Sequence, residues 1–160
     1  MIGDAGPYRF IIDTGANRTA ISRRLAQALA LEVGPSASQV VVHGITGSAI
    51  MPLIELGSLR VGTFGIGRQR VAVLPDAVFG NADGILGIDV LQKARIDIDF
   101  DRDKVVVRAA RTASSEGRLV VRGKLRSGGL MIVPARVGRV RVQAIVDTGA
   151  ERTIGNEALR

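Results

Sequence analysis

One short motif occurs twice in this chain, each time directly after a run of apolar residues. Asp-Thr-Gly-Ala stands at residues 13–16 behind Phe-Ile-Ile and at residues 147–150 behind Ala-Ile-Val. The same offset also aligns Thr19 with Thr153. An internal repeat predicts two copies of one structural unit. Each copy is expected to end a buried strand in a tight turn that carries one carboxylate.

The rest of the sequence favours strands over helices. Hydrophobic residues make up 46% of the 160 residues but aromatic residues only 3%, so a core must be built from Val, Ile, Leu and Ala. Many of these residues are β-branched, and 20 glycines with five prolines supply the turns of an all-β fold. One or two short helices are expected, the first opened by Ser22 as N-cap and the second by Asp89.

Turn and linker signals divide the chain into three parts. Residues 1–108 form a first lobe, with strands predicted over residues 8–12, 39–43, from Ser48 onward, 54–59, 69–74, at the start of 82–94, 96–100 and 105–107. The strand of residues 39–43 and the return strand from Ser48 are expected to form a hairpin around the turn of residues 44–47. Residues 109–117 are small and polar and are interpreted as a linker. Residues 118–160 form the N-terminal part of a second lobe, which is only partly present, with strands over residues 118–125, 130–137 and 140–146.

The glycine and threonine of the motif have separate physical tasks. Gly15 and Gly149 let the backbone pass close to a carboxylate where a Cβ would clash. Thr14 and Thr148 carry hydroxyls that can lock one loop to the other. We therefore expect these four residues to hold two facing loops together.

Two facing loops of this kind would bring Asp13 and Asp147 together. Two neighbouring carboxylates are not easily ionised at the same time, so the pair shares a proton and titrates as a unit. One carboxylate can then take a proton from water while the other donates to a scissile carbonyl. This chemistry needs neither a metal nor a cofactor. The chain has no cysteine and one histidine, His43, which excludes thiolate and multi-histidine sites.

The residues around the first motif resemble a retropepsin-like aspartic protease, in particular bacterial members of that family. IIDTGA is followed further along the chain by the apolar-apolar-Gly element Ile85-Leu86-Gly87 and then by IDIDF. The family's fold is a closed β-barrel in which this element passes beside the catalytic loop. The Gly-rich stretch VHGITGSAI, residues 42–50, stands where the family has a flap over the substrate.

The resemblance implies a role for each matching residue. The catalytic pair would be Asp13 and Asp147. The residues that support the two loops would be Thr14, Gly15, Ala16, Thr148, Gly149, Ala150, Ile85, Leu86 and Gly87. The flap would be formed by Gly44, Ile45, Thr46 and Gly47. The implied activity is hydrolysis of peptide bonds in a polypeptide substrate by an aspartic endopeptidase, with no cofactor and no metal.

Two assemblies and two functions fit the sequence. The site can join Asp13 to Asp147 within one chain as a pseudo-dimer, or join two copies of Asp13 in a homodimer. The alternative to an enzyme is a non-catalytic module that keeps the fold for dimerisation or for binding extended peptides. Related proteins are often exported, which would suit a periplasmic setting if the natural chain is longer at its N-terminus. No signal peptide and no membrane span of about 18 apolar residues is visible.

The formal charge of +7 is confined to the later part of the chain. Residues 1–107 hold 11 basic and 11 acidic side chains, whereas residues 108–160 hold 11 basic and four acidic ones. The acids of the first lobe crowd into its later half, and the sequence stops before the corresponding stretch of the second lobe. We therefore interpret the basic excess as a consequence of where the sequence ends. No nucleic-acid partner is expected, because the chain offers no aromatic platform.

Other charged residues have plainer interpretations. Asp83 and the aspartates of residues 97–103 suggest calcium by their number, but alternating solvent-facing positions and a turn account for them. Asp89 is interpreted as a helix N-cap rather than as an acid behind the catalytic loop. Arg18 and Arg152 follow the two loops and would brace them only by pairing with an acid.

Overall fold

The computed structural model describes residues 1–34, 37–44, 47–110, 120–126 and 129–159. Its largest unit is a mixed six-stranded sheet with the strand order β1-β8-β2-β7-β4-β3. The strands are β1 (Phe10–Ile12), β2 (Ala20–Ser22), β3 (Ser38–Gly44), β4 (Gly47–Leu56), β7 (Gln69–Leu74) and β8 (Gly84–Leu86). The structure is mostly β, as predicted. The expected closed barrel is not found among the described strands, because β1 and β3 remain the two edges of the sheet.

The remaining elements of residues 1–110 are short. They are the hairpin of β5 (Leu59–Val61) and β6 (Phe64–Ile66), the hairpin of β9 (Ala94–Asp99) and β10 (Lys104–Ala109), the helices α1 (Arg23–Ala28) and α2 (Ile88–Leu91), and the 3-10 turn η1 (Asp76–Val78). α1 begins as predicted at Ser22, whose Oγ accepts a hydrogen bond from the Leu25 N–H at 3.0 Å. This bond satisfies one of the free N–H groups at the start of the helix.

The hydrophobic core lies entirely within residues 1–110. Its fully buried side chains come from the inner strands of the sheet and from α2, and include Ile21, Leu56, Val71, Leu86 and Val90. Burying an aliphatic side chain of this size stabilises a fold by about 1.5–3 kcal/mol. Because β2 and β8 both contribute to this core, the core fixes the strands that flank the first motif.

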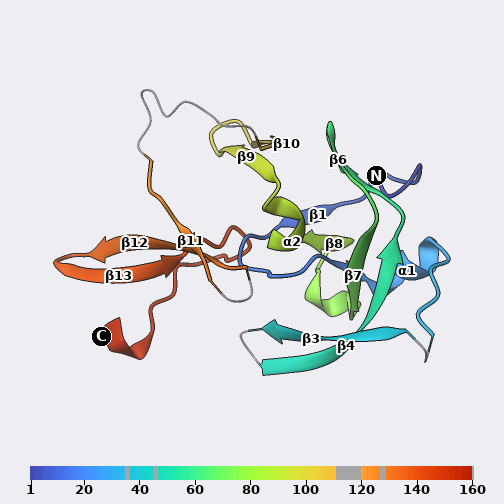
Figure 1. Ribbon diagram of the computed structural model, residues 1–160, viewed down its shortest axis with the longest axis horizontal. Coiled ribbons are helices and arrows are strands. Elements are labelled where there is room, and N and C mark those ends of the chain that lie inside the picture. Colours follow the sequence, from blue (N-terminus) through green and yellow to red (C-terminus); the bar gives the residue numbers. More distant parts are fainter. Residues whose placement is uncertain (35–36, 45–46, 111–119, 127–128, 160) are drawn as a thin grey trace.

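Residues 120–159 form a separate three-stranded antiparallel sheet with the order β11-β12-β13. Its strands are β11 (Lys124–Leu125), β12 (Met131–Val137) and β13 (Val140–Ile145), and the 3-10 turn η2 (Glu157–Leu159) follows. None of the described residues of this segment is buried. Figure 1 shows β12 and β13 as an orange hairpin that projects away from the six-stranded sheet. The predicted linker falls largely on residues 111–119, which lie outside the described residues.

Candidate active site

The first motif continues a strand that is held in place by β8. β1 and β8 run parallel, with Ile11 opposite Ile85 and Ile12 opposite Leu86. The Asp13 N–H donates to the Leu86 carbonyl at 3.0 Å, so the pairing extends into the motif. β8 also pairs with β2 on its other side. The Ile85-Leu86-Gly87 element therefore passes directly beside the Asp13 loop.

Gly87 and Asp89 fasten the far side of this loop. A Cβ at Gly87 would clash with the backbone of Arg18 and Thr19. The Gly87 N–H donates to the Thr19 hydroxyl oxygen at 3.0 Å. The Asp89 carboxylate in turn accepts hydrogen bonds from the Thr19 N–H at 2.9 Å and the Thr19 O–H at 2.7 Å. The Ile88 N–H closes the connection by donating to the Ala16 carbonyl at 2.8 Å.

The interpretation of Asp89 as a helix N-cap is therefore wrong. α2 has Gly87 as its N-cap, without a side-chain hydrogen bond, and Asp89 lies inside the first turn. From there its carboxylate reaches the fully buried Thr19, which is distant in sequence and could not be identified from local helix signals. The sequence signal that could have marked Thr19 as part of the loop was its recurrence as Thr153 after the second motif.

The Asp13 carboxylate is partly enclosed by its own loop. Its Oδ1 accepts hydrogen bonds from the Gly15 N–H at 2.8 Å and the Ala16 N–H at 2.9 Å. Burial raises the pKa of Asp13 above its ordinary value of 3.8; the two N–H donors oppose this shift, and the neighbouring Asp147 carboxyl adds to it. The balance favours a proton on Asp13 at a pH where an ordinary aspartate is ionised.

The two threonines of the repeated motif join the loops symmetrically. The Thr14 N–H donates to Thr148 Oγ1 and the Thr148 N–H donates to Thr14 Oγ1, both at 3.2 Å. The Thr14 hydroxyl also donates to the Val146 carbonyl at 2.6 Å, and the Thr148 hydroxyl to the Ile12 carbonyl at 2.7 Å. Each loop is thus hydrogen-bonded both to the turn of the other loop and to the residue that directly precedes the other motif.

The two glycines lie where the opposite carboxyl group approaches. A Cβ at Gly15 would overlap the Asp147 carboxyl, and a Cβ at Gly149 would overlap the Asp13 carboxyl. Asp147 is exposed, and its Oδ1 accepts one hydrogen bond, from the Gly149 N–H at 2.9 Å. The structure therefore places the carboxyl groups of both motifs in one small region, each against the backbone of the other loop.

The Asp13 loop lies in the part of the chain that matches a known protein family. A family model described as aspartyl protease matches residues 1–90, more than half of the chain. The chain belongs to the aspartyl protease family. The matched part of the chain contains the Asp13 loop, the β3–β4 hairpin and β8, whereas the Asp147 loop lies outside it.

The chain is similar to a solved structure of low sequence identity. That structure is a retropepsin-like aspartic protease from Rickettsia conorii, with 22% sequence identity and a TM-score of 0.43. The alignment covers 62% of this chain and 78% of that chain. No curated protein matches the sequence.

The β3–β4 hairpin includes two of the predicted flap residues, Gly44 and Gly47. β3 and β4 are antiparallel, and Gly44 pairs with Gly47 at the end of the hairpin. Ile45 and Thr46 lie outside the described residues, and His43 lies in β3. Val41 and Ile50 are directly opposite each other and are 50% and 66% exposed. The hairpin therefore presents an apolar cross-strand pair to the solvent.

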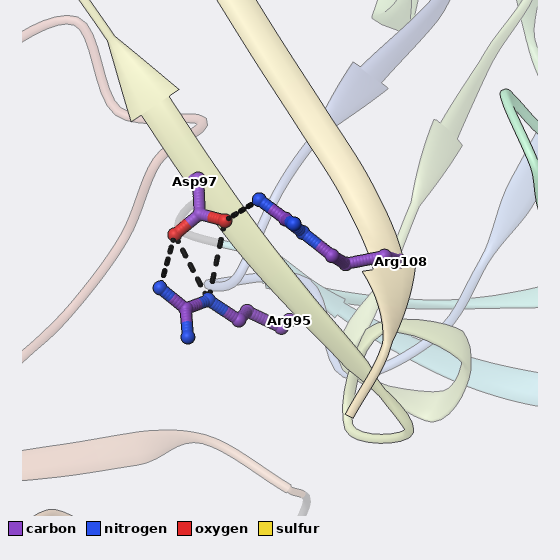
Figure 2. Close-up of polar contacts among 3 residues, drawn as sticks. All are labelled: Arg95, Asp97 and Arg108. Atoms are coloured by element: carbon purple, nitrogen blue, oxygen red, sulfur yellow. Dashed lines mark hydrogen bonds and ion pairs between the residues drawn. The ribbon is translucent and has the colours of Figure 1, made fainter. Parts of the chain in front are cut away.

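Three of the acids that suggested calcium, Asp83, Asp97 and Asp99, form ion pairs with arginines. Figure 2 shows Asp97 between Arg95 and Arg108, with distances of 2.9 Å to Arg95 Nη2 and 2.7 Å to Arg108 Nη2. The hydrogen bonds from Arg95, and then those from Arg108, lower the pKa of Asp97. Asp99 binds Arg102, and Asp83 accepts from the Arg9 N–H. Among the described residues, no group of three or more His, Cys, Asp or Glu side chains is arranged to hold a metal ion.

The arginines that follow the two loops do not brace them. Arg18 and Arg152 are exposed, and neither forms an ion pair with a residue that the structure describes. Ala150 is exposed as well.

Within the part of the chain that the structure describes, no helix has the length and apolar character needed to cross a membrane.

Proposed function

We propose that this aspartyl protease hydrolyses peptide bonds with Asp13 and Asp147 as a catalytic pair formed within one chain. The observation that carries the proposal is the reciprocal hydrogen bonding of Thr14 and Thr148, which joins the two motifs turn to turn. The close approach of each carboxyl to the opposite glycine supports the same pairing. The residues of Ile85-Leu86-Gly87 and the two alanines of the motifs would hold the loops, without a cofactor or metal.

The different environments of the two carboxyls support a division of labour. Asp13, which is partly buried and has a raised pKa, would be the proton donor of the pair, and the exposed Asp147 would act as the base. The Asp147 carboxylate removes a proton from water as the water oxygen bonds to the scissile carbonyl carbon, and Asp13 gives its proton to the carbonyl oxygen. Asp147 then passes its proton to the leaving nitrogen. Asp13 recovers a proton from the diol as the C–N bond breaks and the new carboxylic acid forms.

The repeated motif supports a pseudo-dimer of two related lobes. We propose residues 1–108 as a first lobe, residues 109–117 as a linker, and residues 118–160 as the N-terminal part of a second lobe. β12 and β13 lead into the second motif as β1 leads into the first. The β3–β4 hairpin, with Gly44, Ile45, Thr46 and Gly47, would cover the polypeptide substrate as a flap.

A digest of a peptide library between pH 3 and pH 7 tests this activity. The wild-type protein is compared with Asp13→Asn and with Asp101→Asn, which changes an exposed turn aspartate in the same way. We expect Asp13→Asn to lose about 10²–10⁴-fold in cleavage rate, as is typical when a general acid or base is removed, and Asp101→Asn to cut normally. Equal cutting by all three proteins would refute the proposal. Peptide binding without any cutting, unchanged in Asp13→Asn, would indicate the non-catalytic module instead.

A further inference from the structure

The three-stranded sheet of residues 120–146 has two chemically different faces. Residues directly opposite each other on paired strands share a face. Arg136 is opposite Arg141, and Lys124 is opposite Ile132, which is itself opposite Ile145. Alternation along the strands places Lys124, Arg136 and Arg141 on one face. Arg122 and Arg126 flank β11 and line the same surface hollow as Lys124. We call these five residues the basic face. The other face is apolar and carries Leu125, Met131, Val133, Val137, Val140 and Val142.

The basic side chains line two shallow surface hollows. Arg122, Lys124 and Arg126 line one hollow of about 300 Å³ together with residues of β12 and β13. Arg136 and Arg141 line a second hollow of about 510 Å³. Positive charge therefore lies beside both hollows, which share Pro134 in their linings.

No negative charge balances the basic face within the described structure. Residues 120–146 contain no Asp or Glu at all. The five ion pairs of the described residues all join acids and arginines of residues 1–108, and none involves the basic face. Like charges directly opposite each other, as at Arg136 and Arg141, destabilise a sheet. An anionic ligand would remove this repulsion.

The basic face is continuous with the candidate active site. β13 ends at Ile145, which is 52% exposed on that face and precedes Asp147 by two residues. With about 3.3 Å per residue along a strand, Arg141 lies roughly 20 Å from the Asp147 loop. Lys124 is two strands away from Ile145, or about 10 Å, since neighbouring strands are about 4.8 Å apart.

We propose that the basic face binds an acidic stretch of the polypeptide substrate, about four to six residues from the scissile bond at about 3.3 Å per residue. This inference rests on the proposed peptidase function, because that function supplies a polypeptide at the end of β13. A polypeptide is favoured over single-stranded nucleic acid because residues 101–160 contain no aromatic side chain on which bases could stack. Binding of an acidic substrate stretch would give the excess of basic residues in the later part of the chain a function that the sequence alone did not predict.

Matched peptides test the proposal through the ratio of kcat/KM for a peptide with an acidic tail to kcat/KM for the same peptide with a Gln tail. One scissile sequence is given a tail of four Asp or four Gln residues, on either side, and kcat/KM is measured at low and at high salt. We expect the acidic tail on one side to raise kcat/KM by at least about tenfold, and the advantage to vanish in about 0.5 M NaCl. The ratio should fall to about one in Arg136→Gln/Arg141→Gln. It should stay unchanged in the control Arg60→Gln/Arg70→Gln, which removes the same charge from the exposed surface of the first lobe.

Fluorescence anisotropy with the labelled acidic peptide separates this proposal from the catalytic one. If no peptide is cut, the peptidase function fails, and binding alone decides whether the basic face recognises acidic chains. Equal binding of acidic and Gln-tailed peptides, or equal loss of binding in both double variants, would overturn the inference. It would also be overturned if a single-stranded DNA oligonucleotide of equal charge displaced the acidic peptide at lower concentration than unlabelled acidic peptide does.

Discussion

The two copies of the Asp-Thr-Gly-Ala motif have the same sequence but different surroundings. The Asp13 loop is paired with β8, fastened by Thr19 and Asp89, and attached to the buried core. The Asp147 loop follows a sheet without a buried residue among those described, and Thr153, the counterpart of Thr19, is exposed. Two backbone N–H groups donate to Asp13 and one to Asp147.

The difference shows that the motif specifies the turn, while the surrounding fold determines how firmly the turn is held. Among the described residues, the contacts that the second loop makes with the rest of the molecule are concentrated at the first loop, through Thr14 and Thr148. The first loop is therefore a fixed template, and the second loop is positioned on it. Three kinds of substitution test this difference between the two loops.

The largest effect is expected from closing the space between the loops. Gly15→Ala and Gly149→Ala each introduce a Cβ that overlaps the opposite carboxyl group. The weakly held Asp147 loop should move in both variants, and a displacement of about 1 Å can cost about a hundredfold in rate. Peptide cleavage should therefore fall by that factor or more, while thermal unfolding of the first lobe stays close to wild type.

Gly57→Ala is the matched control, because a Cβ at Gly57 meets no atom within 4 Å. Its cleavage rate and its unfolding temperature should both remain unchanged. Full activity in Gly15→Ala and Gly149→Ala would mean that the two loops do not face each other in solution.

A smaller effect is expected from removing one hydroxyl at equivalent positions. Thr19→Val leaves the Gly87 N–H without its acceptor and removes the hydroxyl donor of Asp89, which keeps its hydrogen bonds from the backbone N–H groups of residue 19 and Val90. An unsatisfied buried group costs about 1–3 kcal/mol, so the free energy of unfolding should drop by that amount. Thr153→Val changes an exposed side chain and should stay within about 0.5 kcal/mol of wild type. Urea unfolding measures both, and equal losses would show that the second loop is as deeply embedded as the first.

The smallest effect concerns the pH dependence of stability. The pKa of Asp13 is raised in the folded protein above 3.8, so ionising Asp13 disfavours folding. The loss of stability from ionising Asp13 is absent below pH 3.8, where Asp13 is protonated in both the folded and the unfolded protein. This loss grows as the pH rises through the raised pKa of the folded protein. Asp13→Asn should therefore match the wild-type unfolding temperature near pH 3 and exceed it by a few degrees at pH 7.

Asp97→Asn provides a control of opposite sign. The pKa of Asp97 is lowered by Arg95 and Arg108, so its charge stabilises the fold above pH 3.8 and this contribution is lost as the pH falls through the lowered pKa. Asp97→Asn should be less stable than wild type at pH 7 and approach it in acid. If the stability of both variants relative to wild type changed in the same direction with pH, the environments assigned to Asp13 and Asp97 would be contradicted.

Local patterns predicted the elements that depend on neighbouring residues. The Ser22 cap follows from the residues directly after it, and the β3–β4 hairpin from the glycines between two apolar runs. The role of Asp89 did not follow, because its partner Thr19 is far away in the chain. The closed barrel was inferred from resemblance alone, and the strand order of the described residues leaves the sheet open. The charge of the basic face was visible in the sequence, but its placement on one side of a sheet depended on the register of three strands.

In the proposed pseudo-dimer one chain supplies both carboxylates, so the Asp147→Asn variant should be inactive. The measurement is kcat/KM on a cleaved peptide for wild type, Asp13→Asn and Asp147→Asn over a range of protein concentrations. Both variants should be equally inactive, and wild-type activity per chain should not depend on concentration. Wild-type activity in Asp147→Asn, with none in Asp13→Asn, would contradict the claim and assign the site to two Asp13 loops from separate chains.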